Sequence, residues 1–405
     1  MSSHGPGNHG PGNHGPGQAD GRPLFFLIAG EPSGDRLGAR LMTALRQATG
    51  GRARFTGVGG PRMAAAGLQS LFPYDRLSVM GLVEVVRHLP RLLGDIHRAA
   101  RAARAARPAA VITIDSPDFS FRVARRLQGA GIPLVHYVAP SVWAWRPGRA
   151  RKVAKLYDLL LCLLPFEPPW FTPHGLDARF VGHSVVEPDE NQVTGEAVPR
   201  APWPAASVTR LCLLPGSRTG EVRRLLPVFR QAVDLLARRR TLDVVVPTVP
   251  TVAALVRQGT ADWSVPVRVV EDIAAHGPAM AQCDVALAAS GTVTLELAKH
   301  GVPMIVAYRT HPLTAFIARR LLRVSTVTLI NLVEGRQVIP EYIQADCTPE
   351  RLAAAVGGLL DDSRAAAAQT SASHHALVSL GMHDDAPSRR GALAILDCLG
   401  TPPTG

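Results

Sequence analysis

Short apolar runs alternate along the chain with segments in which apolar residues recur every three or four positions. The first run, Leu24–Ala29, breaks at the polar segment Gly30–Asp35 and is followed by Leu37, Leu41 and Leu45. A short continuous apolar run favours a strand that is buried on both faces, and the leucine spacing favours an amphipathic helix. This stretch therefore predicts a strand, a loop and a helix in succession.

The same unit recurs in both halves of the chain. Further strands are predicted at Ala110–Ile114, Leu134–Val138, Leu159–Leu163, Val208–Leu214, Leu242–Val246, Val267–Val270, Val285–Ala288 and Met304–Ala307. Strands that alternate with helices form parallel sheets, so the pattern predicts an α/β fold with two Rossmann-like domains that face a central cleft. Polar loops follow the carboxyl ends of the strands, and we expect a ligand there.

Composition along the chain predicts the domain limits. Proline and polar residues interrupt the pattern before Val208, and a His-Gly-Pro-Gly-Asn repeat precedes the first strand. A repeat of this kind cannot bury a core. We expect a disordered tail at 1–22, an N-terminal domain at 23–186, a linker at 187–207, a C-terminal domain at 208–360, and a helical region at 361–405 that packs back on the first domain.

The net charge of the chain limits its possible binding partners less than the apolar pattern limits its possible folds. The 405 residues include 44 basic and 32 acidic side chains, a net charge of +12. That balance suits nucleic acid, an anionic membrane face or phosphorylated substrates, but nearly all of the excess is arginine, which a GC-rich genome also produces. The 5 cysteines are far apart and mostly in apolar runs, which is typical of reduced thiols in a cytosolic protein. Since no apolar run is long enough to span a bilayer, any membrane contact is expected to be peripheral.

Gly216, Ser217 and Arg218 follow the strand Val208–Leu214 and precede a helical pattern. Backbone N–H groups at a helix N-terminus attract anions, and a guanidinium fork suits a diphosphate. The segment therefore predicts a site for a sugar nucleotide. The alternative is an ordinary strand-to-helix turn with a solvated arginine.

A second polar loop, Ser290, Gly291 and Thr292, follows the strand Val285–Ala288, with Glu296 one turn into the next helix. Its amides would bind another part of the same anion, and Glu296 would accept hydrogen bonds from ribose hydroxyls. Plain helix capping is the alternative.

Carboxylates follow two strands of the first half. Asp115 comes directly after Ala110–Ile114, where a carboxylate is well placed to take a proton from an incoming hydroxyl, so we interpret it as a general base. Glu31 and Ser33 lie in the Gly30–Asp35 loop and are expected to face the same cleft. For this loop the alternative is a tight turn in which Asp35 caps a helix.

Three other sets of residues carry weaker signals. His136 and His183 are interpreted as packed or capping residues rather than catalysts, and Gly57–Gly60 lacks the remainder of a dinucleotide fingerprint. Aromatic side chains near basic residues would stack nucleobases or line a groove for sugar or lipid; they are Tyr137, Trp143 and Trp145, close to Arg146, Arg149, Arg151 and Lys152.

Segment 79–104 has an apolar helical face and several arginines, although Pro90 interrupts it. Such a helix would contact an anionic membrane or acyl chains, or would equally pack on the core with its arginines in solvent. The residues predicted to make membrane or acyl contact are Leu82, Val83, Val86, Leu89 and Leu93.

Taken together, motifs spread over most of the chain resemble the lipid-A-disaccharide synthase family. The resemblance runs from about Leu24 to about Leu360 and is carried by Ala29–Asp35, Gly57–Met63, Val79–Glu84, Asp115–Phe119, His136–Trp145, Leu214–Arg218 and Ala289–Thr292.

The resemblance implies an inverting, metal-independent GT-B glycosyltransferase of Gram-negative bacteria with no cofactor. It would transfer 2,3-diacylglucosamine from UDP-2,3-diacylglucosamine to 2,3-diacylglucosamine 1-phosphate, forming a β(1→6) disaccharide 1-phosphate and UDP. It would act in the cytoplasm at the inner face of the inner membrane, as a peripheral protein, with a homodimer as the expected assembly and no nucleic-acid partner. The alternatives are another GT-B enzyme that uses UDP-N-acetylglucosamine and, more remotely, a nucleic-acid-binding protein.

The resemblance also assigns residues. Asp115 matches the family's candidate base, Glu31 and Ser33 match its first-half active-site loop, and Arg218, Glu296 and Asn331 match positions expected to hold UDP. The chain departs from the family pattern at Ile330, where a proline usually precedes the asparagine.

Overall fold

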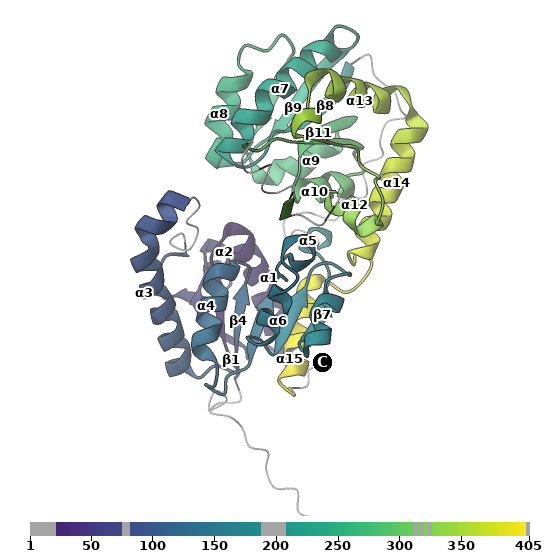
Figure 1. Cartoon of the computed structure of the whole chain (residues 1–405). Coiled ribbons are helices and arrows are strands. Elements are labelled where there is room, and N and C mark those ends of the chain that lie inside the picture. The colour runs from purple at the N-terminus through teal and green to yellow at the C-terminus, as the bar shows by residue number, and fades with distance from the viewer. Residues whose placement is uncertain are drawn as a thin grey trace, which may run out of the picture.

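The computed structural model has two lobes joined by two chain crossings (Figure 1). It describes residues 22–74, 82–187, 208–311 and 326–401, with four single residues between the last two ranges, and within 82–90 it describes the backbone alone. The tail predicted at 1–22, except Arg22, and the linker predicted at 187–207, except Glu187, lie outside these residues.

The N-terminal lobe is built on a seven-stranded parallel sheet with the order β3-β2-β1-β4-β5-β6-β7. The four inner strands β1, β4, β5 and β6 are buried and mainly apolar because helices cover both faces of the sheet. The strands are β1 (Leu24–Ala29), β2 (Arg54–Val58), β3 (Gln69–Ser70), β4 (Ala110–Ile114), β5 (Leu134–Tyr137), β6 (Leu159–Cys162) and β7 (Asp177–Phe180).

Two separate cores hold the helices of this lobe against the sheet. Leu41 and Leu45 of α1 pack on one face together with Ile395 of the last helix, α15, whereas Ile96 of α3 and Phe119 of α4 pack on the other. The helices are α1 (Pro32–Ala48), α2 (Pro61–Ala65), α3 (Leu82–Ala106), α4 (Pro117–Leu127), α5 (Val142–Trp145), α6 (Arg149–Ala154), with short 3-10 turns η2 (Pro168–Trp170), η3 (Thr172–His174) and η4 (Ser184–Val186).

The C-terminal lobe contains a six-stranded parallel sheet with the order β10-β9-β8-β11-β12-β13. Its strands are β8 (Val208–Leu214), β9 (Thr241–Pro247), β10 (Val267–Val270), β11 (Val285–Ala289), β12 (Met304–Tyr308) and β13 (Glu341–Ile343). Its helices are α7 (Thr219–Ala237), α8 (Pro250–Thr260), α9 (His276–Ala281), α10 (Val293–Lys299), α12 (Leu329–Glu334), α13 (Pro349–Asp361) and α14 (Ser363–Ser379), with 3-10 turns η5 (Ile273–Ala275) and η6 (Gln344–Asp346).

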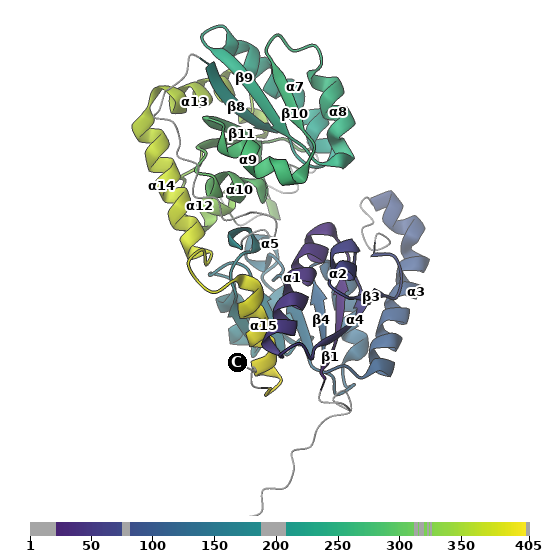
Figure 2. The ribbon, with the colours of Figure 1, turned by 180° about the vertical axis from the view of Figure 1, so that it is seen from behind.

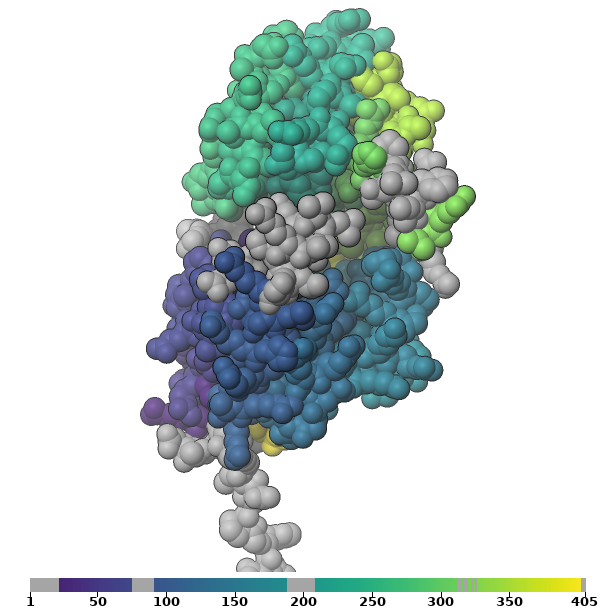
Figure 3. All heavy atoms as spheres, turned by 60° about the vertical axis from the view of Figure 1, so that its left-hand side comes forward, coloured from purple at the N-terminus to yellow at the C-terminus, as the bar shows by residue number. Residues whose placement is uncertain are grey.

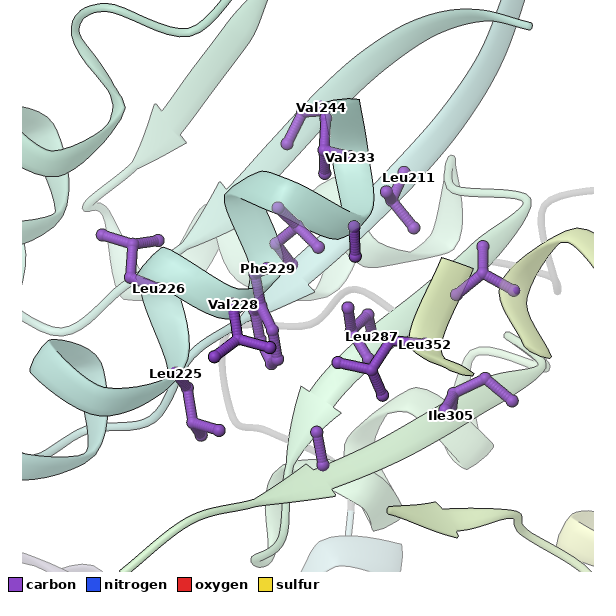
Figure 4. Close-up of a cluster of buried hydrophobic side chains, with 14 of the residues drawn as sticks. Leu211, Leu225, Leu226, Val228, Phe229, Val233, Val244, Leu287, Ile305 and Leu352 are labelled. Carbon is purple, nitrogen blue, oxygen red and sulfur yellow. The ribbon is translucent and has the colours of Figure 1, made fainter. Parts of the chain in front are cut away.

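Helix α7 is fixed to this second sheet by its apolar face. Figure 4 shows Phe229 and Val233 of α7 in the cluster that also contains Leu287 of β11 and Leu352 of α13. All four side chains are fully buried. Since α7 begins at the end of β8, this packing fixes the position of its N-terminus at the edge of the sheet that faces the other lobe.

The chain passes between the lobes twice, and the two crossings are hydrogen-bonded to each other. The His183 N–H donates to the Leu380 carbonyl at 3.0 Å, next to the turn that joins α14 to α15 (Pro387–Cys398). Glu187 accepts a hydrogen bond from Ser388 and lies 3.6 Å from the Arg40 guanidinium of α1. The yellow helix α15 therefore lies against α1 in the first lobe, although it ends the chain (Figure 2).

The predicted fold class is confirmed, including the helix that returns to the first lobe. Strands β8 and β10 begin and end at the predicted residues, and the other predicted strands differ by a residue or less at each end. Helix α3 continues through Pro90, where the sequence indicated an interruption. A proline removes one helical hydrogen bond and bends a helix, but its neighbours can keep the helix intact. Among the described residues, none of the helices is both long and apolar enough to cross a bilayer.

Candidate functional site

The predicted site residues follow the four strands at which the two sheets reverse their order. Strand β1 lies beside β4 in the first sheet, and β8 lies beside β11 in the second. In open parallel sheets a ligand binds outside the carboxyl ends of the strands at such a reversal. Glu31 and Asp115 follow β1 and β4, while Arg218 and Ser290 follow β8 and β11.

Asp115 lies in a strained turn between β4 and α4. Its φ is 52° and that of Ser116 is 46°, so two successive residues with side chains are left-handed, a conformation that costs energy. Three hydrogen bonds hold the turn: Asp115 N–H to the Tyr137 carbonyl at 2.9 Å, Ser116 N–H to Asp115 Oδ1 at 2.8 Å, and Ser120 Oγ to the Asp115 carbonyl at 2.8 Å. The half-buried carboxylate is thus fixed in place through its Oδ1.

Glu31 connects the two lobes electrostatically. It is half-buried at the N-cap of α1. Burial raises the pKa of Glu31, the charge of Asp115 raises it further, and the charge of Arg218 lowers it. The three charged groups therefore share one environment at the facing strand ends. Ser33 is exposed in the first turn of the same helix.

The segment Gly30–Asp35 is not the loop with two cleft carboxylates that the sequence indicated, because α1 already begins at Pro32. Asp35 is buried and accepts hydrogen bonds from the N–H groups of Gly60 at 2.9 Å and Met63 at 3.0 Å, both at the start of α2. Its carboxylate caps α2, as in the alternative interpretation, and leaves Glu31 as the carboxylate of this segment that shares the environment of Asp115 and Arg218.

Arg218 is the N-cap of α7, the residue from which the helix begins. Its side chain is 63% exposed, and its Nη1 donates to Glu221 Oε1 at 3.2 Å. Gly216 has a φ of 112°, and a Cβ there would lie 2.6 Å from Glu221 Oε2, so the loop requires glycine for two reasons. The exposed guanidinium thus lies at the N-terminus of a long helix, next to Gly216 and Ser217, where backbone N–H groups lack partners within the helix.

The second polar loop lies one strand away, at the end of β11. Ser290 Oγ donates to the Val327 carbonyl at 3.0 Å, which ties the loop to the segment before α12. Gly291 and Thr292 are exposed, and Glu296 is half-buried in α10.

Asn331 uses its side-chain amide inside the protein. Its Nδ2 donates to the Ile339 carbonyl at 2.9 Å and to Glu341 Oε1 at 3.0 Å, while its Oδ1 accepts from the N–H groups of Val338 at 2.8 Å and Ile339 at 2.7 Å. An amide has two donor hydrogens and two acceptor lone pairs, so these four bonds satisfy it. In this conformation the Asn331 side chain positions the loop and has no donor or acceptor left to bind UDP.

Glu341 is the residue at this site that the sequence reasoning missed. Besides Asn331, its carboxylate accepts hydrogen bonds from Thr326 and from the N–H groups of Val327 and Thr328. It therefore holds the same segment that binds Ser290. No sequence signal identified it, because its partners come from a turn rather than from a motif.

The predicted membrane and acyl contacts are described only in part. The side chains of Leu82, Val83, Val86 and Leu89 lie outside the described residues. Leu93 is half-buried and packs against the core beneath α3 and α4. At this position the helix therefore matches the core-facing alternative.

The remaining candidates, two histidines and one tyrosine, pack in the protein interior or cap a helix. Burial lowers the pKa of His136 to about 3, and its ring packs on Tyr157 at 5.0 Å. His183 Nδ1 accepts from Val185 N–H and caps η4. Both match the packed or capping interpretation. Tyr137 is 1% exposed, so it cannot stack a nucleobase.

A model of the lipid-A-disaccharide synthetase family matches residues 25–391, beyond Leu360, where the resemblance was expected to end. Lipid-A-disaccharide synthase of Rhodospirillum centenum is 51% identical over 93% of this chain and 94% of its own. The synthases of Paramagnetospirillum magneticum and Gluconobacter oxydans are 46% and 44% identical, with 93% and 94% of this chain covered and 97% and 91% of theirs.

Solved structures share the fold at low identity. A Staphylococcus aureus MnaA–UDP structure has a TM-score of 0.62 with 14% identity, and covers 93% of this chain and 97% of its own. The kitacinnamycin glycotransferase has a TM-score of 0.61 with 18% identity, at 93% and 99% coverage. Acinetobacter baumannii MurG has a TM-score of 0.55 with 13% identity, at 92% and 99% coverage.

Proposed function

The chain belongs to the lipid-A-disaccharide synthase family, and from that premise we propose which residues perform the reaction and on which substrates. The protein is a glycosyltransferase that forms the lipid A disaccharide. Its donor is UDP-2,3-diacylglucosamine and its acceptor is 2,3-diacylglucosamine 1-phosphate. The products are the β(1→6) disaccharide 1-phosphate and UDP.

Asp115 is the general base in this proposal. It takes the proton of the acceptor 6-hydroxyl as the oxygen attacks the anomeric carbon of the donor. The donor is an α-glycoside and the product a β-glycoside, so one displacement with one base is sufficient. The hydrogen-bonded turn supports this role, because a base fixed in position contributes most when the hydroxyl is held against it.

The C-terminal lobe holds the departing UDP. Negative charge grows on the diphosphate as the glycosidic bond breaks, and the Arg218 guanidinium with the first amides of α7 stabilises it. Ser290, Gly291, Thr292 and Glu296 contact the remainder of the nucleotide. Glu341 and Asn331 act through the segment that binds Ser290.

Glu31 and Ser33 complete the acceptor side. Since burial and Asp115 raise the pKa of Glu31, its carboxyl keeps a proton to higher pH than an ordinary glutamate does. The raised pKa favours a role in binding and orientation and leaves Asp115 as the base.

We place the reaction at the inner face of the inner membrane, with the protein bound peripherally and assembled as a homodimer. Support for the membrane contact comes from the described half of α3, where Arg91, Arg98 and Arg101 are exposed. An anionic membrane surface attracts such arginines.

The placement of Asp115 after β4 and of Arg218 after β8, at the points where the two sheets reverse their strand order, carries the proposal, and the response of the Glu31 pKa to both charges supports it. The test is a mass-spectrometric assay with defined acylated donor and acceptor. We expect disaccharide 1-phosphate and UDP, and little product when UDP-N-acetylglucosamine replaces the donor. Turnover of unacylated UDP-N-acetylglucosamine with no product from the acylated pair would favour the alternative GT-B activity instead.

A further inference from the structure

Helices α4 and α6 line a cavity of about 280 Å³ in the N-terminal lobe that is open to solvent. Its apolar wall is formed by Pro117, Phe121 and Leu156. Ligand sites for drug-sized molecules are larger, typically ~300–1,000 Å³. The cavity is therefore of a size for one small group rather than for an acyl chain or a whole sugar nucleotide.

The remaining wall of the cavity is cationic. Arg122, Arg125 and Lys152 are exposed, and none has a hydrogen-bond or ion-pair partner for its side chain among the described residues. Arg149 is more enclosed, with a side chain 24% exposed, and its guanidinium lies 5.0 Å from the centroid of the Phe121 ring. Stacking on the ring fixes the direction of the guanidinium.

Asp118 does not neutralise this charge. Its Oδ1 is 3.8 Å from Arg149 Nη2, and its side chain is 96% exposed. An ion pair so long and so exposed is weak. The cavity therefore keeps an excess of positive charge, arranged for an anion that accepts several hydrogen bonds.

The cavity begins beside the candidate base. Pro117 starts α4 two positions after Asp115, and Arg125 lies about 12 Å further along the helix at 1.5 Å per residue. In Figure 1, α4 and α6 lie next to each other on the face of the lobe turned to the reader. In Figure 3 the dark blue surface that contains α4 faces the reader in the lower lobe.

We propose that this cavity binds the phosphomonoester of the acceptor while Asp115 contacts the acceptor's 6-hydroxyl. The inference rests on the proposed function. In a hexopyranose 1-phosphate the anomeric carbon and the carbon that bears the hydroxymethyl group both flank the ring oxygen. The phosphate and the reacting hydroxyl are therefore carried on the same edge of the sugar ring, on either side of the ring oxygen. This fits a cavity that starts at Pro117, close to Asp115.

The role of the cavity is to orient the acceptor. A phosphate held by guanidinium and ammonium groups fixes one side of the sugar and directs the hydroxyl to the base. Loss of these cations should raise the KM for a phosphorylated acceptor and leave kcat at saturation nearly unchanged. An acceptor without a phosphate does not contact these cations, so its KM should not depend on them.

The test variant is Arg125→Ser/Lys152→Ser, which removes two exposed cations of the cavity. Its matched control is Arg151→Ser/Lys155→Ser, which removes two exposed cations of the neighbouring surface that do not line it. We expect the test variant to raise the KM for the 1-phosphate acceptor about tenfold or more, a loss of one strong charged contact, and to leave the KM for the 1-hydroxy analogue unchanged. The control should keep the wild-type preference for phosphate.

An unchanged preference for the phosphorylated acceptor in the test variant would overturn the inference while leaving the proposed function intact. Absence of disaccharide from either acceptor with the wild type would instead remove the proposed function. Vesicles of phosphatidylglycerol without acceptor distinguish the source of the phosphate. If the test variant alone loses vesicle binding and keeps its preference, the cavity binds a phospholipid headgroup and the inference is wrong.

Discussion

The Arg218 guanidinium lowers the pKa of Glu31, although the two residues follow strands of different sheets. Charges from both lobes thus act on one carboxyl, which follows β1, while Arg218 follows β8. Asp115 acts on Glu31 in the opposite direction from within the first lobe. Glu31 therefore responds to whatever neutralises Arg218.

Binding of a UDP-sugar is expected to take up a proton. The diphosphate would neutralise Arg218 and so raise the pKa of Glu31 further, because only the lowering influence is removed. UDP-sugar affinity should then fall as pH increases through the pKa of Glu31 in the free protein. Calorimetry in buffers of different ionisation enthalpy measures the protons bound, and a UDP-sugar avoids the titration of a terminal phosphate.

Glu31→Gln should abolish this proton uptake and still bind the nucleotide. Arg223→Gln, on the exposed side of α7, is the matched control and should behave as the wild type does. The same proton uptake in Glu31→Gln would assign it to another group.

Asp115→Asn is expected to slow turnover by about 100-fold or more, the usual loss when a general base is removed. Asparagine tolerates the left-handed φ of 52° as aspartate does, and its carbonyl can still accept from Ser116 N–H. The melting temperature and UDP affinity should therefore stay near wild type, which alanine would not guarantee. Turnover near the wild-type rate would exclude Asp115 as the base.

Asn331→Ala should act mainly on stability. It leaves the N–H groups of Val338 and Ile339 without their buried acceptor, at a cost of roughly 2–4 kcal/mol in the free energy of unfolding. Urea unfolding measures this loss. UDP affinity, measured well below the transition, should fall by less than about tenfold, or ~1.4 kcal/mol. A much larger loss of affinity at unchanged stability would make Asn331 a direct ligand.

Glu167 makes the free energy of unfolding depend on pH. Its buried carboxyl accepts from Leu164 N–H at 3.0 Å and from Trp143 Nε1 at 3.3 Å, and burial raises its pKa to about 7. The unfolded chain loses this proton near pH 4.5, so the stabilisation is complete below that pH and is lost as pH rises through about 7.

Comparison with Glu167→Gln isolates the contribution of Glu167 to the free energy of unfolding. The difference in unfolding free energy between wild type and variant should decrease by about 3 kcal/mol at most between pH 4 and pH 8. Other groups cancel in this difference. A difference that stays constant or increases over the range would contradict the raised pKa.

The sequence predicted the features that are local. The apolar run before Gly30 and the break at Pro215–Gly216 depend on neighbouring residues, and both became strand ends at the cleft. Strand β2 is not predicted from the sequence, because its alternating face is short and polar residues and Gly57 interrupt its apolar pattern.

The pattern of apolar and polar residues does not predict contacts between segments that are distant in the sequence. Asp35 caps a helix that begins at Pro61, and Glu341 binds a turn before α12, so neither role can be read from adjacent residues. The cavity between α4 and α6 likewise needs Arg125 and Arg149, whose separation in sequence hides that they share one wall. Spacing finds helices and strands, whereas these roles depend on how the elements pack.

The return of α15 to the first lobe has a consequence for biosynthesis. Ile395 and Leu396 fill the same core as Leu41 and Leu161. During translation, the earliest sheet emerges long before the helix that covers part of one face. The nascent chain must therefore keep that apolar surface exposed, open to chaperones, until α15 has left the ribosome.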